Sequence, residues 1–202
     1  MYAPPKIATF LVLLSAMLFQ ISPGAQSTQL HALSTQSSVD ASQSHLLLLH
    51  NTHTGERIHV VYRQGENYIP SAIAKLDYFL RDHRTGDVRH FDPRLYDILS
   101  DLTGMVGHSD AEIDIVCGYR TPSTNESLRA RTAGVAKNSL HIQAQAIDLR
   151  IPGITTLTLR HAALALGRGG VGYYPHSDFI HVDTGRVRQW CFNCSASLAE
   201  GN

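Results

Sequence analysis

The sequence predicts an α+β fold, organised as a single domain with a small antiparallel sheet flanked by helices. Its 202 residues, of which 43% are hydrophobic, suffice for one core of ordinary size. Strand and helix patterns follow one another without the strict strand-helix-strand repeat of a parallel fold. Two pairs of consecutive strand patterns are joined by turn sequences, which is typical of antiparallel hairpins.

The first four predicted elements are two strands and two helices. They are the strands 46–50 and 57–62 and the helices 70–82 and 93–104. Asn51 and Gly55 suit the turn that makes the two strands a hairpin. Each helix begins at a proline, Pro70 or Pro93, and repeats apolar residues on one face, and Gly104 ends the second helix.

The later elements carry most of the residues with chemical interest. They are the strand 112–117, the short helix 123–131, the strand 144–151, the helix 155–166, and the strands 171–174 and 179–183 around a turn at 175–178. The strand 112–117 delivers Arg120 into a loop at its C-terminal end, a common place for functional side chains. Asp148 shares one face of its strand with Ala146 and Arg150.

Charge and the N-terminus narrow the class of protein. Lys and Arg number 17 and balance 17 Asp and Glu, so the net charge gives no reason to expect nucleic acid or an anionic membrane as the main partner. Lys6 precedes an apolar run at 7–21 that is short for a membrane span, and small residues up to Ala25 offer a cleavage site. We expect residues 1–25 to be a signal peptide, or a membrane anchor if uncleaved.

Composition divides the rest of the chain. Residues 26–44 are rich in Ser, Gln and Thr and are predicted to be a flexible linker, residues 45–190 the folded domain, and residues 191–202 a tail. The tail carries Cys191 and Cys194, and with Cys117 the count is odd, so at least one thiol is unpaired or bonded elsewhere. A disulfide within the tail, or from the tail to Cys117, is favoured over a zinc knuckle, because no second C-x-x-C is present. It is favoured over a redox pair because the motif lies away from any strand-to-helix turn suited to thiol redox chemistry.

His141, Asp148 and His181 offer two imidazoles and one carboxylate, the ligand types of a hydrolytic zinc site. Three protein ligands leave a fourth position open for water, which distinguishes a catalytic zinc from a structural one. The spacing of seven between His141 and Asp148 excludes a pair on one helix face, so the site must be built between strands. Each residue alone has a structural interpretation, such as a surface acid or a core histidine. Together they predict a metallohydrolase.

Four more residues are candidates for catalysis. Asp178 and Asp183 are both candidates for the general base, and either could instead orient a ligand histidine. His176 could hydrogen-bond a developing oxyanion. Arg120 could hold a substrate carboxylate or polarise a carbonyl. The residues by themselves favour neither carboxylate as the base.

Several blocks resemble the M15 peptidase clan, specifically its YcbK-like branch (the DUF882 family) of murein endopeptidases. The blocks lie at 51–56, 80–86, 118–122, 139–141, 146–150, 172–175 and 181–185, within a similarity that covers about 46–190. The resemblance implies an M15/hedgehog-like core and a periplasmic enzyme that cuts peptide cross-links of peptidoglycan, with Zn2+ held by His141, Asp148 and His181. It also implies that Asp178 and His176 assist catalysis and that Arg120 contacts the scissile region. Ala144 stands where glycine is commoner in the clan.

Three functions from different classes stay open at this point. The leading one is a murein endopeptidase of L,D or D,D type that acts on stem peptides during cell-wall growth or remodelling. The second is a zinc D-alanyl-D-alanine carboxypeptidase, which would use Arg120 or Arg150 for the free carboxylate of its substrate. The third is a non-catalytic wall-binding module. The complete ligand set and the surviving acids Asp178 and Asp183 argue against the third.

Overall fold

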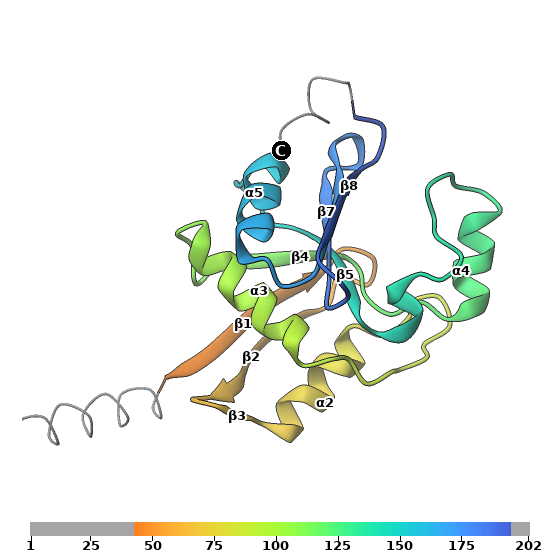
Figure 1. Ribbon diagram of the computed structural model, residues 1–202. Coiled ribbons are helices and arrows are strands. Elements are labelled where there is room, and N and C mark those ends of the chain that lie inside the picture. Colours follow the sequence, from red (N-terminus) through yellow and green to blue (C-terminus); the bar gives the residue numbers. More distant parts are fainter. Residues whose placement is uncertain (1–42, 195–202) are drawn as a thin grey trace, which may run out of the picture. The chain divides into compact units, whose positions relative to one another are not determined.

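The structure, a computed structural model, describes residues 43–194 of the chain. Its frame is an eight-stranded sheet in the order β3-β2-β1-β4-β5-β7-β6-β8 (Figure 1). The strands are β1 (Ser44–Asn51), β2 (Arg57–Gln64), β3 (Asn67–Tyr68), β4 (Glu112–Cys117), β5 (Ala146–Arg150), β6 (Gly170–Tyr174), β7 (Phe179–Asp183) and β8 (Arg188–Cys191). The α+β prediction is confirmed.

The sheet is larger than the small antiparallel one expected, and it is mixed. Both expected hairpins are present, since β1 pairs antiparallel with β2 and β6 with β7. However, β1 runs parallel to β4, and β6 runs parallel to β8. The first parallel pair is possible because the intervening helices make the long crossover that such a pair requires. The second arises because the chain turns back after β7 and adds β8 on the far side of β6.

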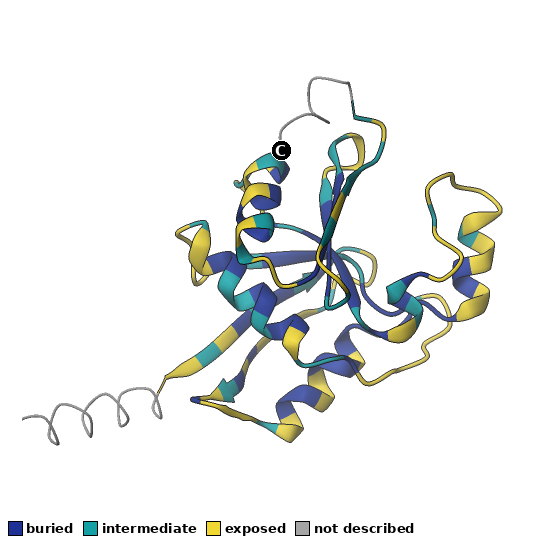
Figure 2. Ribbon diagram, viewed as in Figure 1, coloured by how far each residue is buried: buried dark blue, intermediate teal, exposed yellow. Residues whose placement is uncertain are grey.

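Helices cover the sheet unevenly. They are α2 (Pro70–Phe79), α3 (Arg94–Met105), α4 (Pro122–Arg129) and α5 (Thr156–Leu166), with the 3-10 turns η1 (Leu140–Gln143) and η2 (Pro175–Ser177). The helices α3 and α5 contact each other, and between them they contact β1, β6 and β7. In Figure 1, α4 stands apart from both, and Figure 2 shows it largely exposed while the central strands are buried.

The core and the polar residues occupy opposite faces of the central strands. Ile147 and Leu149 of β5 and Ile180 and Val182 of β7 are at most 2% exposed, and each such side chain contributes about 1.5–3 kcal/mol through burial. Because successive side chains alternate, Asp148 and the residue beside it on β7 point to the other face. The apolar face is thus used for stability and the other is free for chemistry.

The described residues settle only part of the predicted domain organisation. They include no helix long and apolar enough to cross a membrane. The predicted signal peptide, almost all of the predicted linker, and the tail from residue 195 onward lie outside the described residues. Cys191 and Cys194 form a disulfide, and Cys117 is a free thiol. Of the two pairings considered, the one within the tail is therefore present.

Candidate metal centre

His141 is fixed by a short turn and by one hydrogen bond. It lies in η1, which Ser139 begins by accepting a hydrogen bond from the His141 backbone N–H, and which ends at Ala144 in the left-handed region, with φ 54°. The His141 Nδ1 lies 2.8 Å from the backbone carbonyl oxygen of Gly118. A carbonyl can only accept, so Nδ1 carries the hydrogen and donates it. The lone pair of Nε2 therefore faces inward, as a metal ligand requires.

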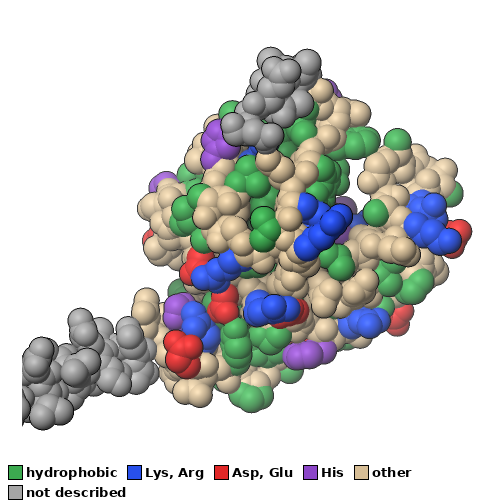
Figure 3. All heavy atoms as spheres, viewed as in Figure 1, with side chains coloured by type: hydrophobic (Ala, Val, Ile, Leu, Met, Phe, Trp, Pro, Cys, Tyr) green, Lys and Arg blue, Asp and Glu red, His purple; other side chains and the backbone are tan. Residues whose placement is uncertain are grey.

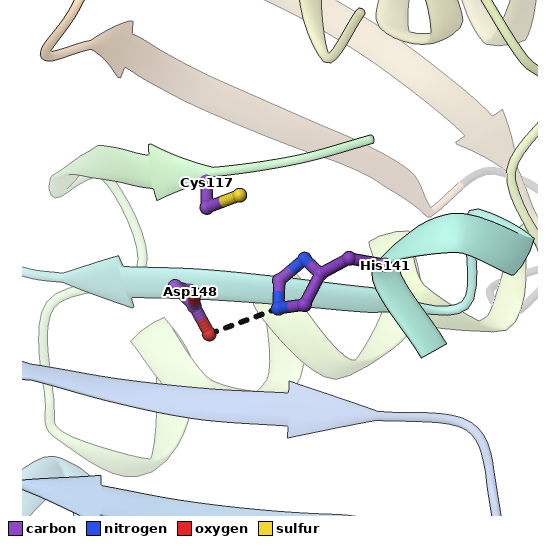
Figure 4. A group of neighbouring side chains, drawn as sticks. All are labelled: Cys117, His141 and Asp148. Carbon is purple, nitrogen blue, oxygen red and sulfur yellow. Dashed lines mark hydrogen bonds and ion pairs between the residues drawn. The ribbon is translucent and has the colours of Figure 1, made fainter. Parts of the chain in front are cut away.

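Asp148 and His181 are direct neighbours across the sheet. They pair in the register of β5 with β7, and Asp148 pairs on its other side with Cys117 of β4. Three adjacent strands thus place Cys117, Asp148 and His181 in one row, and η1 brings His141 over it. Figure 4 shows the side chains of Cys117, His141 and Asp148 pointing toward a common centre.

Three ligand atoms converge at this centre. Asp148 Oδ1 lies 3.2 Å from His141 Nε2 and 2.9 Å from His181 Nδ1, and the two nitrogens are 3.1 Å apart. Ligand atoms around a tetrahedral ion at about 2.0–2.1 Å are separated by about 3.3 Å, close to these distances. Two inward lone pairs beside a carboxylate oxygen repel one another unless a cation lies between them. The donor set therefore fits a metal ion held by two imidazoles and one carboxylate.

Asp183 lies behind His181, where both of its carboxylate oxygens accept hydrogen bonds. Its Oδ2 lies 3.0 Å from His181 Nε2, and its Oδ1 accepts from the backbone N–H groups of Gly170 and Gly185 at 2.9 and 2.8 Å. Arg188 donates to both carboxylate oxygens. His181 therefore donates through Nε2 and keeps the lone pair of Nδ1 for the centre. At 1% exposure, Asp183 orients a ligand and does not face the cavity.

The electrostatics of the three ligand residues agree with this arrangement. Burial alone would raise the pKa of Asp148, but the charges and hydrogen bonds of His141 and His181 outweigh it and lower the pKa well below its usual range. Burial lowers the pKa of His141. For His181, burial would also lower the pKa, but the hydrogen bonds to Asp148 and Asp183 raise it. At neutral pH the site therefore holds a carboxylate and a neutral His141, both ready to bind a cation.

A cavity of about 360 Å³ opens onto the ligand residues. One wall is apolar and is formed mainly by aromatic rings, namely Tyr174, Phe179, Trp190 and Phe192. Another part of the lining, the cationic wall, carries cationic and imidazole side chains, namely His53, His83, Arg84 and Arg120. Figure 3 shows the molecule hollowed between the region of α4 and the region of β7 and β8, with basic and histidine side chains at the hollow. The cavity can therefore admit a chain-like substrate beside the centre.

The structure brings some of the predicted catalytic residues to this cavity and not others. Arg120 lines it, donates through Nη2 to Ser139 Oγ at 3.2 Å, and leaves its buried Nε without a partner among the described residues. Asp178 and His176 are exposed and do not line it. The Asp178 carboxylate instead accepts a hydrogen bond from Thr156 at 3.3 Å. The reason is local, because Asp178 lies outside β7, directly after η2, and its backbone is in the left-handed region with φ 51°.

Three contributors to the site were not predicted from the sequence. Cys117 belongs with His141 and Asp148 to a group whose possible ligand atoms lie within 4.8 Å of one another. Arg188 pairs with Asp183, and Trp190 packs beside His181 with ring centroids 5.0 Å apart. The signal available in the sequence was the run of small residues in β6, where Gly170 and Gly172 leave room for side chains from the next strand.

Comparison with known proteins adds independent information. The model of the Peptidase_M15_2 family, described as peptidoglycan L,D-endopeptidase MepK, matches residues 39–190. The chain is 46% identical over 145 residues to the peptidoglycan L,D-endopeptidase MepK of Escherichia coli K12, covering 72% of this chain and 79% of that protein. It is 43% identical over 152 residues to the probable peptidoglycan L,D-endopeptidase MepK of Haemophilus influenzae, covering 75% and 82%. No solved structure matches the chain.

Proposed function

The chain belongs to the M15-type peptidase family described as peptidoglycan L,D-endopeptidase MepK, and from this we propose that it hydrolyses peptide cross-links of peptidoglycan, cutting bonds of the L,D type. The observation that carries the proposal is the convergence of His141, Asp148 and His181 on the floor of an open cavity. A hydrolytic centre needs both ligands and access for substrate, and the two coincide here.

We infer that the metal is zinc. Two imidazole nitrogens and one carboxylate oxygen form a donor set that zinc accepts in hydrolases, with one position left for water. When bound, zinc polarises the scissile carbonyl and brings the pKa of its water towards about 7, so that hydroxide is available at neutral pH. His141 and His181 would hold it as neutral imidazoles, each oriented by an acceptor behind it.

Arg120 is proposed to bind the carbonyl oxygen of the scissile amide. It lines the cavity, is 9% exposed, and has an Nε without a partner among the described residues. A guanidinium held by Ser139 and directed at the site would stabilise the negative charge that develops on that oxygen. Its role would therefore be electrostatic, and the backbone of the loop after β4 would supply its position.

The proton acceptor is proposed to be other than Asp183. Within residues 43–194, Asp148 is the only carboxylate that lines the cavity, and Asp183 is saturated by hydrogen bonds behind His181. Asp178 remains a predicted base on the sequence pattern, but its carboxylate is turned to Thr156. Within residues 43–194, the cavity lining therefore offers no carboxylate besides Asp148 that could take a proton from a substrate or water.

The alternatives receive less support. The family and the relatives that the chain matches are described as endopeptidases, which favours that activity over a carboxypeptidase. Of the two residues considered for a terminal carboxylate, Arg120 lines the cavity, whereas Arg150 pairs with Asp114 outside it. A wall-binding module would need no preformed ligand set.

The substrate class and the predicted export signal both favour the periplasm as the location, which we propose for the domain after removal of residues 1–25.

Digestion of purified sacculi tests the proposed function. The wild-type protein with zinc is expected to release muropeptides that come from cutting L,D cross-links, identified by mass spectrometry. Exhaustive chelation should stop the release and added zinc should restore it. His141→Ala should be inactive, whereas His108→Ala, at an exposed position outside the cavity, should be active. Release of the same products by His141→Ala would overturn the assignment.

A further inference from the structure

The cationic wall of the cavity is built from three segments, and one buried carboxylate links two of them. Asp82, which is 1% exposed, accepts hydrogen bonds from the backbone N–H of Arg84 at 2.9 Å and from that of Thr121 at 2.8 Å. The same carboxylate thus fixes the loop that carries Arg84 and the residue next to Arg120. A pair of charge-assisted hydrogen bonds to backbone gives a rigid link, so the two guanidinium groups stand on one preorganised wall.

The third segment is the turn between β1 and β2. The Asn51 side chain holds this turn by accepting from the backbone N–H groups of His53 and Thr54 at 3.0 and 3.1 Å. His53 donates through Nε2 to the Val116 carbonyl at 3.0 Å, and its ring stacks on that of His83 at 4.0 Å between centroids. Each of these imidazole rings is therefore held in place beside Arg84.

The charge of this wall is not neutralised within the protein. Arg84 lines the cavity, and its guanidinium makes no hydrogen bond or ion pair with any residue in the described part of the chain. The pKa of His83 is lowered to about 4 by burial and by the charges of His53 and Arg84, so its ring is neutral at neutral pH. The one cavity carboxylate within 43–194, Asp148, is engaged by the two ligand histidines. The wall therefore offers a free cation to an incoming anion.

We propose that Arg84 is a specificity-determining residue that binds a free carboxylate of the stem peptide beside the scissile bond. The inference rests on the proposed function and names the group that the cavity recognises. A planar guanidinium matches a carboxylate through two parallel N–H···O bonds, which a neutral amide cannot accept with equal strength. The stacked pair of His53 and His83 would bound the subsite, and Arg120 would remain available for the scissile carbonyl.

The test compares two cross-linked stem peptides that differ only at that group, a free carboxylate in one and a primary amide in the other. The wild-type zinc protein is expected to cleave the carboxylate form with kcat/KM at least about tenfold higher, as one charge-assisted hydrogen-bond pair predicts. Arg84→Gln should lose about 10- to 100-fold on the carboxylate form and stay within about twofold on the amide form. Arg84→Lys should recover part of the loss.

Arg129→Gln is the matched control, because Arg129 is exposed at the end of α4 and does not line the cavity. It should behave as the wild type on both substrates. Equal losses on both substrates in Arg84→Gln, or no loss on either, would overturn the inference while leaving the proposed function intact. If the wild-type zinc protein cleaves neither substrate, the proposed function is overturned, and this inference with it. Melting temperatures of all variants report whether they are folded.

Discussion

Arg188 forms a two-point ion pair with Asp183, with Nη2 to Oδ2 at 2.6 Å and Nη1 to Oδ1 at 3.0 Å. Since Asp183 accepts from His181 Nε2, the charge of Arg188 on β8 acts on the candidate ligand His181 of β7. Burial would raise the pKa of Asp183, but the hydrogen bonds from His181 and Arg188 outweigh it and lower the pKa. This chain of contacts makes the last strand part of the centre.

Removing the Arg188 charge should weaken zinc binding. Arg188→Gln leaves Asp183 with one partner fewer, so that it orients His181 less firmly, and loss of such an outer partner typically costs about 10- to 100-fold in metal affinity. Competition with a chromophoric chelator measures the change. Arg186→Gln, at an exposed position two residues away, is the control and should bind zinc as the wild type does. Equal affinities for all three proteins would contradict the prediction.

Substitution of the two candidate bases, Asp178 and Asp183, should affect activity differently. Asp178→Asn is expected to keep kcat/KM within about threefold, because its carboxylate contacts Thr156 outside the cavity. Asp183→Asn is expected to lower both activity and zinc affinity at least about tenfold, because it disturbs the hydrogen bond that orients His181. Sacculus digestion and zinc titration of the two variants decide this. A larger loss of activity in Asp178→Asn would restore Asp178 as the base.

Zinc affinity should fall as the pH falls. The pKa of His181 is raised above its ordinary value of 6.5, because hydrogen bonds to Asp148 and Asp183 outweigh burial. Without metal, His181 therefore holds its extra proton up to a higher pH, and zinc must displace that proton from Nδ1. Below this pKa the Kd should rise by about tenfold per pH unit for one displaced proton. Chelator competition between pH 8 and pH 6 tests it, and a constant Kd would refute it.

A methyl group on β6 should damage the site. Gly172 pairs with His181 on one side and with Trp190 on the other, and a Cβ there would overlap the Trp190 ring. Gly172→Ala should cost about 1–3 kcal/mol in the free energy of unfolding, as overpacking does, and should move the indole away from His181. Gly104→Ala is the matched control, because Gly104 lies in α3 with open space around it. That change should stabilise by up to about 1 kcal/mol. Denaturant unfolding measures both.

Local pattern was enough to predict the long elements, and it singled out the three residues that converge at the candidate centre. The helices α3 and α5 and the hairpin of β6 and β7 each lie within a few residues of the predicted ranges. Their apolar periodicity is set by neighbouring residues, which the sequence displays directly. His141, Asp148 and His181 stood out because they combine the residue types of a zinc site with a spacing that excludes one helix face. By contrast, β3 has only two residues and β8 only four, too few for a periodic signal.

The position of Cys117 shows what local pattern omits. The register of β4 with β5 shifts between Ile115 and Cys117, so that Cys117 and not its neighbour Val116 lies opposite Asp148. A β-bulge of this kind adds one residue to one strand and redirects the side chains that follow. The sequence contains no marker for it. The contact of Arg188 with Asp183 was missed for a related reason, since it depends on how β8 docks beside β6.

The glycines of β6 make the candidate centre depend on the last strand of the sheet. His141, Asp148 and His181 all precede residues 188–190 in the chain, and the bare glycines Gly170 and Gly172 make the room that Arg188 and Trp190 occupy. Only with the final strand in place beside β6 do Arg188 and Trp190 reach their partners. A polypeptide that stopped short of residue 188 would therefore carry His141, Asp148 and His181 without the contacts through which Arg188 and Trp190 support His181.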